Sequence, residues 1–123
     1  MSVSDWIFQV VHSFYQKAKS DILIGHHFRI IQDFETHIPR IAAFWELQLL
    51  GSTRRPISEP FDVMKVHIPL NIKRGELGRW LVLFKKTLDE ETLKHPEFSD
   101  LKELWLLRLI FFEGVFSRFF GFK

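Results

Sequence analysis

The chain has 123 residues, no cysteine and a net charge of +2. This length suits one domain, residues 1–123, and the lack of cysteine excludes disulfide bonds and thiolate metal sites. The charge is too small to predict nucleic-acid binding, and neither a signal peptide nor an apolar run of transmembrane length is visible. We therefore expect a cytoplasmic protein. Its core should be rich in aromatic rings, because Phe occurs 14 times and Trp four times.

The first third of the chain is predicted to hold one regular helix and one short one. Ser4 is a candidate N-cap, and apolar residues recur every three or four positions from Ile7 to Ala18, as on the buried face of a helix. This helix should end near Asp21. The stretch from Asp21 to Phe28 indicates a short helix or a turn, weakened by Gly25.

A longer helix is expected next, capped by Asp33 and buried along the face that runs from Phe34 to Leu49. Pro39 lies inside this pattern, where it removes a backbone hydrogen bond and predicts a late start or a kink. Residues 51–60 combine Gly, Ser, Thr and two prolines, so they indicate a loop.

The second half of the chain begins with the short apolar segment Phe61–Leu70, which Pro69 interrupts. A helix is then predicted from about Lys73 to Glu90, a break at Pro96, and a last helix from about Ser99 to Phe120. No alternating strand pattern occurs. These patterns together predict an all-α fold whose helices are too unequal for a regular four-helix bundle.

Six histidines are the candidates for binding chemistry. No pair has the spacing of a helical zinc protease motif, and the adjacent His26 and His27 should point apart on a helix, which makes them poor co-ligands. We expect surface roles for these two and for His12 and His95. The other two histidines, His37 and His67, accompany apolar faces. Either they are hydrogen-bonded core residues, or they face each other across a slot.

Two aromatic side chains with polar ends accompany these histidines. Tyr15 is the single Tyr of the chain, and its hydroxyl needs a partner if it is buried among Phe residues. Trp80 carries an indole N–H that can only donate a hydrogen bond. Both could reach the surface with their polar ends, or both could point at a bound ligand. The other charged groups, such as those of Arg54, Arg55 and Asp89–Glu91, suit solvated faces.

Five pieces of the chain, in this order, resemble the third group of the truncated haemoglobins. They are Phe14-Tyr15; Phe28; His37 followed seven residues later by Phe44-Trp45; His67-Ile-Pro-Leu70 after the loop; and Trp80-Leu-Val-Leu-Phe84 in the next helix. The likeness covers about residues 14 to 88. The chain also lacks the paired-glycine motifs of the other groups, as group III members do. Each piece alone is weak, and the combination is specific.

This resemblance implies a shortened globin fold, a two-over-two helical sandwich around haem b. It implies His67 as the proximal iron ligand and a distal side lined by Tyr15, His37 and Trp80. Phe28, Phe44 and Trp45 would then pack around the porphyrin. Cations at the rim would pair with its propionates, and Arg40 is our first candidate, with Lys65 and Arg79 as others.

Three functions follow as hypotheses. The first is a haem protein that binds O2, CO or NO and is kept ferrous by an unidentified electron donor. The second is an enzyme at the same pocket that uses NO or peroxide, although no carboxylate is placed to strengthen the proximal ligand and Asp62 lies five residues before His67. We name no catalytic residue, and ligand binding is the expected role. The third is a cofactor-free helical module, because the C-terminal helix is apolar on nearly every side and could mediate homo-oligomerisation.

Overall fold

Every regular element that the computed structural model describes, over residues 1–56, 67 and 70–122, is helical. The helices are α1 (Val3–Ala18), α2 (Gly25–Arg29), α3 (Phe34–Leu50), α5 (Arg74–Lys94) and α6 (Ser99–Phe119), with the 3-10 turn η2 (Pro96–Phe98) before α6. The prediction of an all-α fold is confirmed. Most of the segment Phe61–Leu70, including Pro69, lies outside the described residues.

The first two helices begin at short polar turns. The Oγ atom of Ser2 accepts the backbone N–H of Asp5 at 3.0 Å, so Ser2 caps α1, and the prediction of Ser4 as the cap was wrong by two residues. The hydroxyl of Ser4 instead accepts a hydrogen bond from Arg55. The carboxylate of Asp21 accepts the N–H groups of Leu23 and Ile24 and forms the turn that leads into α2.

Helix α3 begins where the sequence predicts. The Asp33 carboxylate accepts both the backbone N–H and the hydroxyl of Thr36, and Phe34 is the first helical residue. Of the late start or kink expected at Pro39, the late start is therefore wrong, because the helix includes this proline. Gly51 ends the helix in the left-handed conformation, with φ +78°, which favours glycine.

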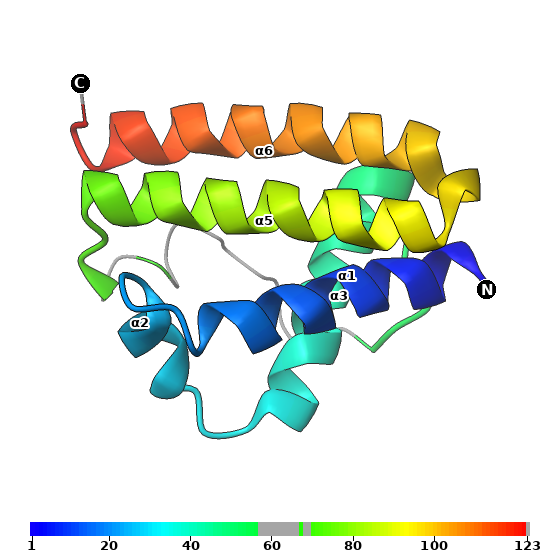
Figure 1. The fold of residues 1–123 in the computed structure, drawn as a ribbon, viewed down its shortest axis with the longest axis horizontal. Coiled ribbons are helices and arrows are strands. Elements are labelled where there is room, and N and C mark those ends of the chain that lie inside the picture. Colours follow the sequence, from blue (N-terminus) through cyan, green and yellow to red (C-terminus); the bar gives the residue numbers. More distant parts are fainter. Residues whose placement is uncertain (57–66, 68–69, 123) are drawn as a thin grey trace.

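The last two long helices are antiparallel neighbours (Figure 1). Helix α5 ends at Lys94, one turn beyond the predicted Glu90, because Glu91 is buried and the indole N–H of Trp6 donates to its backbone carbonyl at 3.2 Å. The break at Pro96 and the start of α6 at Ser99 are confirmed.

The four long helices form two packed pairs, α1 with α3 and α5 with α6, and α1 also packs on α5. Figure 1 shows α1 and α5 side by side and α3 crossing behind them. At the centre each helix contributes one aromatic ring: Trp6, Trp45, Phe84 and Trp105, whose neighbouring centroids lie 5.4 to 6.0 Å apart. This cluster joins the two pairs and confirms the predicted two-over-two arrangement and its aromatic core.

A buried ion pair holds the loop after α3. Glu46 is 3% exposed, and its Oε2 atom lies 2.7 Å from Nε of Arg55. Arg55 also donates to the backbone carbonyl of Ser4, at 3.1 Å, so the loop is joined to the start of α1. Arg55 is therefore not the solvated residue that the sequence predicted.

Helix α6 keeps part of its apolar surface in solvent. Five large side chains are more than a third exposed: Leu104, Leu107, Ile110, Phe111 and Phe119. A bilayer-spanning helix is not found among the residues described above.

Candidate functional site

A cavity of about 320 Å³ opens between the two helix pairs, on one side of the aromatic core. Its walls come from α1, α2, α3, α5 and α6, and they are mostly aromatic and aliphatic. A pocket of this size, apolar with a few converging polar groups, is typical of a small-molecule or cofactor site. Its lining includes most of the residues that the sequence singled out: Tyr15, Phe28, His37, Arg40, Phe44, Trp45, His67 and Trp80.

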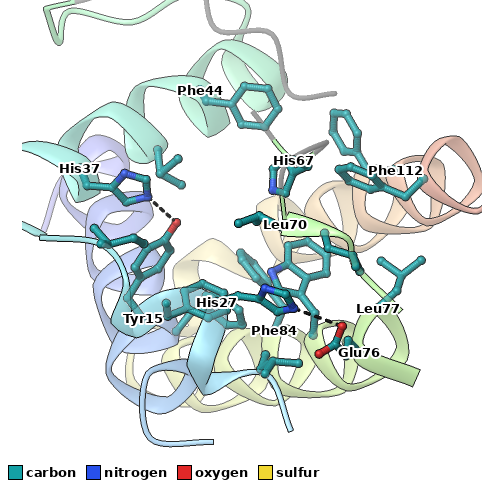
Figure 2. A pocket seen from close by; sticks show the side chains of 18 of the residues that line it. Tyr15, His27, His37, Phe44, His67, Leu70, Glu76, Leu77, Phe84 and Phe112 are labelled. Atoms are coloured by element: carbon teal, nitrogen blue, oxygen red, sulfur yellow. Dashed lines mark hydrogen bonds and ion pairs between the residues drawn. The ribbon is translucent and has the colours of Figure 1, made fainter. Parts of the chain in front are cut away.

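Tyr15 and His37 meet inside this pocket (Figure 2). The Oη atom of Tyr15 lies 3.0 Å from Nε2 of His37, a hydrogen bond that joins α1 to α3. Tyr15 is 8% exposed. Burial raises the pKa of its hydroxyl far above the ordinary value, so the group keeps its proton at pH 7. The partner that the buried phenol was expected to need is His37.

His37 is half-buried in the first turns of α3, close to the Asp33 cap. Burial lowers the pKa of its imidazole, and the positive charges of Arg40 and His67 lower it further. The ring is therefore neutral at pH 7, with one nitrogen that donates and one that accepts. A neutral His37 can either accept the Tyr15 proton or donate its own Nε2–H to the Tyr15 oxygen.

His67 faces His37 across the pocket (Figure 2). Its ring meets the ring of Phe116 edge to face, with 5.1 Å between centroids, and Phe44 lies close by. Leu70 lines the pocket beside it. The two histidines that the sequence selected thus occupy opposite walls of one apolar space, as the slot hypothesis predicts.

Aromatic rings build the floor of the pocket. Phe28 meets the ring of Tyr15 edge to face at 5.2 Å. Trp80 packs on Phe84 at 5.3 Å and on Phe14 at 5.9 Å. These contacts fix the positions of Tyr15 and Trp80 on neighbouring helices and make this side of the pocket aromatic.

Of the three cations proposed for the rim, Arg40 lines the pocket. Arg79 does not, because its guanidinium pairs with the Asp21 carboxylate at 2.8 Å. The Arg79 hydrogen bond is the main reason that the pKa of Asp21 is lowered, against the opposing effect of burial. Arg79 is therefore engaged in joining α5 to the turn before α2. Lys65 and Asp62 lie outside the described residues.

Two residues of the wall were missed at the sequence level. His27 and Glu76 line the pocket, with Nε2 of His27 3.1 Å from Oε1 of Glu76, and each side chain is little more than a tenth exposed. The surface role expected for His27 was therefore wrong. Phe112 and Phe116 of α6 also contribute to the wall; their sequence signal was the excess of apolar residues on that helix.

Comparison with known proteins identifies the fold. No protein-family model matches the chain, and no curated protein sequence does so either. A solved structure does match: the group III truncated hemoglobin from Campylobacter jejuni, with a TM-score of 0.76 and 22% sequence identity over 98% of this chain and 92% of that chain. The chain therefore has the fold of a truncated haemoglobin.

Proposed function

We propose that the pocket binds haem b and that the chain binds a diatomic gas, O2, CO or NO, at the haem iron. The observation that carries the proposal is the pair of histidines on opposite walls of an aromatic pocket, one of them hydrogen-bonded to a buried phenol. The similarity in fold to a group III truncated hemoglobin supports it.

The residues present fit this cofactor. Haem b needs an axial imidazole, walls that exclude water, and cations for its propionates. His67 would be the proximal ligand, Phe28, Phe44, Trp45 and Trp80 would pack around the porphyrin, and Arg40 would pair with a propionate. When bound, haem supplies an iron coordination position at which a diatomic molecule can bind.

The polar groups of the distal wall would hold that molecule. If His37 donates its Nε2–H to the oxygen of Tyr15, the Tyr15 proton is free to point into the pocket. A neutral hydrogen bond of this kind contributes about 1 kcal/mol, which slows ligand dissociation about fivefold. In this arrangement His37 would act through Tyr15, as a positioning residue, and the Trp80 indole N–H would be a second donor from the pocket lining.

The test is the visible spectrum of the protein expressed with a haem supply. We expect a Soret band in the ferric and ferrous forms and a shifted band after CO is added. Tyr15→Phe should keep the Soret band and release O2 about fivefold faster than the wild type. A protein that remains colourless when hemin is added would contradict the proposal.

A haem enzyme is the second candidate, with NO or peroxide as substrate. This candidate is supported by His37, a titratable residue in the lining of the pocket. However, burial lowers the pKa of His37, so at pH 7 it is not a ready proton donor, and this favours ligand binding. Stopped-flow mixing of NO with the O2-saturated ferrous protein separates the two, because an enzyme should react faster than an oxygen carrier.

The exposed apolar side chains of α6 support a further proposal, self-association. Leu107, Ile110 and Phe111 are each more than half exposed. A second copy of the chain could cover them, with or without a cofactor in the pocket. Gel filtration at several concentrations would test this, and a monomer at every concentration would count against it.

A further inference from the structure

Three side chains that can bind a metal converge at the edge of the pocket, apart from the two facing histidines. Nε2 of His26 lies 3.2 Å from Oε2 of Glu76, and Nε2 of His27 lies 3.1 Å from Oε1 of the same carboxylate. The ligand atoms of the three residues all lie within 4.8 Å of one another. Figure 2 shows the His27 ring and the Glu76 carboxylate side by side below the histidine pair.

These spacings match the coordination sphere of a small divalent ion. Zinc binds imidazole nitrogen and carboxylate oxygen at about 2.0 to 2.2 Å, so two ligand atoms of a tetrahedral site are about 3.3 Å apart. The two nitrogen–oxygen distances in the cluster are within about 0.2 Å of that edge. The three ligand atoms lie within 4.8 Å of one another, so rotation of the side chains would bring them onto one ion.

The carboxylate is already oriented for such a role. Oε1 of Glu76 accepts the backbone N–H of Lys73 at 2.8 Å, at the start of α5. This hydrogen bond leaves Oε2 directed at His26. A second partner that fixes a metal-binding carboxylate in this way is a common feature of protein metal sites.

The histidine nitrogens are available as ligands. Nε2 of His27 is buried, and the Glu76 carboxylate lies 3.1 Å from it. A metal ion between the two groups would satisfy both of them. His26 is about half exposed, so the ion would have a route from solvent and a position for water.

We propose that His26, His27 and Glu76 form a binding site for one divalent transition-metal ion of the zinc class. Two imidazoles, one carboxylate and one water complete a tetrahedral set, and imidazole favours zinc, copper and nickel over calcium and magnesium. The ion would join α2 to the first turn of α5 and so fix one wall of the pocket. This inference does not depend on the haem proposal, because none of the three ligands is assigned to haem.

Zinc titration of the tag-free full-length chain by isothermal calorimetry tests the site. We expect one Zn²⁺ ion per chain, in the haem-loaded and haem-free protein alike. Glu76→Gln keeps an oxygen that can accept from Lys73 but removes the charged ligand, and His26→Ala changes an exposed side chain. Each should weaken zinc binding by at least about tenfold. His95→Ala, which removes a histidine paired only loosely with Glu97, should bind as the wild type does.

Zinc X-ray absorption supplies an independent readout, since iron does not interfere at the zinc edge. Two imidazole ligands are expected in the wild type and one in His26→Ala. Circular dichroism of each variant checks that the fold is kept. The proposal is overturned if the wild type binds no zinc, or if Glu76→Gln and His26→Ala bind it as tightly as the wild type. In either case the three residues are only an ion-paired link between α2 and α5, and the haem spectrum is unaffected.

Discussion

The hydrogen bond between Tyr15 and His37 predicts an energetic coupling between α1 and α3. The two atoms lie 3.0 Å apart, and Tyr15 is 8% exposed. A neutral hydrogen bond contributes about 1 kcal/mol to the free energy of unfolding. Tyr15→Phe should lower the free energy of unfolding by about this amount and no more, because the half-buried His37 can turn the nitrogen that loses its partner to water. His37→Leu should cost at least as much, because it leaves the buried Tyr15 hydroxyl without its partner.

A double-mutant cycle isolates this interaction. The free energy of unfolding in urea is measured for the wild type, the two single variants and the double variant, all in the same haem state at pH 7.5. We expect a coupling energy of about 1 kcal/mol. As a control, Tyr15→Phe combined with His95→Ala should be additive. If the Tyr15–His37 cycle is also additive within about 0.3 kcal/mol, the two side chains do not interact as described.

Three further predictions concern stability. Burial lowers the pKa of His37, so the unfolded chain binds a proton at higher pH than the folded one. The haem-free protein should thus lose stability as the pH falls from about 7 to 5. The midpoint of urea unfolding measures this loss, which should be smaller in His37→Leu. Gly25→Ala should destabilise by about 1 to 3 kcal/mol, because its Cβ would meet the backbone carbonyl of Lys19 at 2.9 Å. Gly78→Ala, which has open space, should stabilise α5 by up to about 1 kcal/mol. Arg55→Met should lower the free energy of unfolding by about 3 kcal/mol, because it leaves the buried Glu46 carboxylate without its cation.

Each of these has an outcome that would refute it. A pH dependence identical in the wild type and in His37→Leu would mean that the imidazole titrates alike in both states. Equal effects of the two glycine substitutions would contradict the close packing of α2. Arg54→Met is the control for Arg55→Met, since Arg54 is exposed and should change stability by less than about 0.5 kcal/mol.

Local signals in the sequence predicted the helices well. Asp33 starts α3 through its own side chain, and Pro96 interrupts the chain between α5 and α6, so both boundaries follow from nearby residues. The last turn of α5 was missed for a tertiary reason. Glu91 looks like part of a solvated acidic run, but it is buried. Its backbone carbonyl accepts a hydrogen bond from the indole N–H of Trp6, which lies near the other end of the sequence.

The site could be predicted in part. Tyr15 and His37 were selected because each places a polar group on an apolar face, yet their hydrogen bond depends on how α1 crosses α3, which no local pattern contains. The adjacent histidines were judged by the geometry of a long helix, in which neighbours diverge. Helix α2 is five residues long, and the rings of His26 and His27 lie with centroids 4.0 Å apart and both reach Glu76.

The central claim is that the His67 imidazole binds the haem iron, and replacing that imidazole from solution tests it most directly. His67→Gly should bind hemin weakly, and added imidazole should restore both the Soret band and the iron–imidazole band in the resonance Raman spectrum of the ferrous form. If His67→Gly binds haem as the wild type does, with an iron–imidazole band and no added imidazole, another residue holds the iron and the account is wrong.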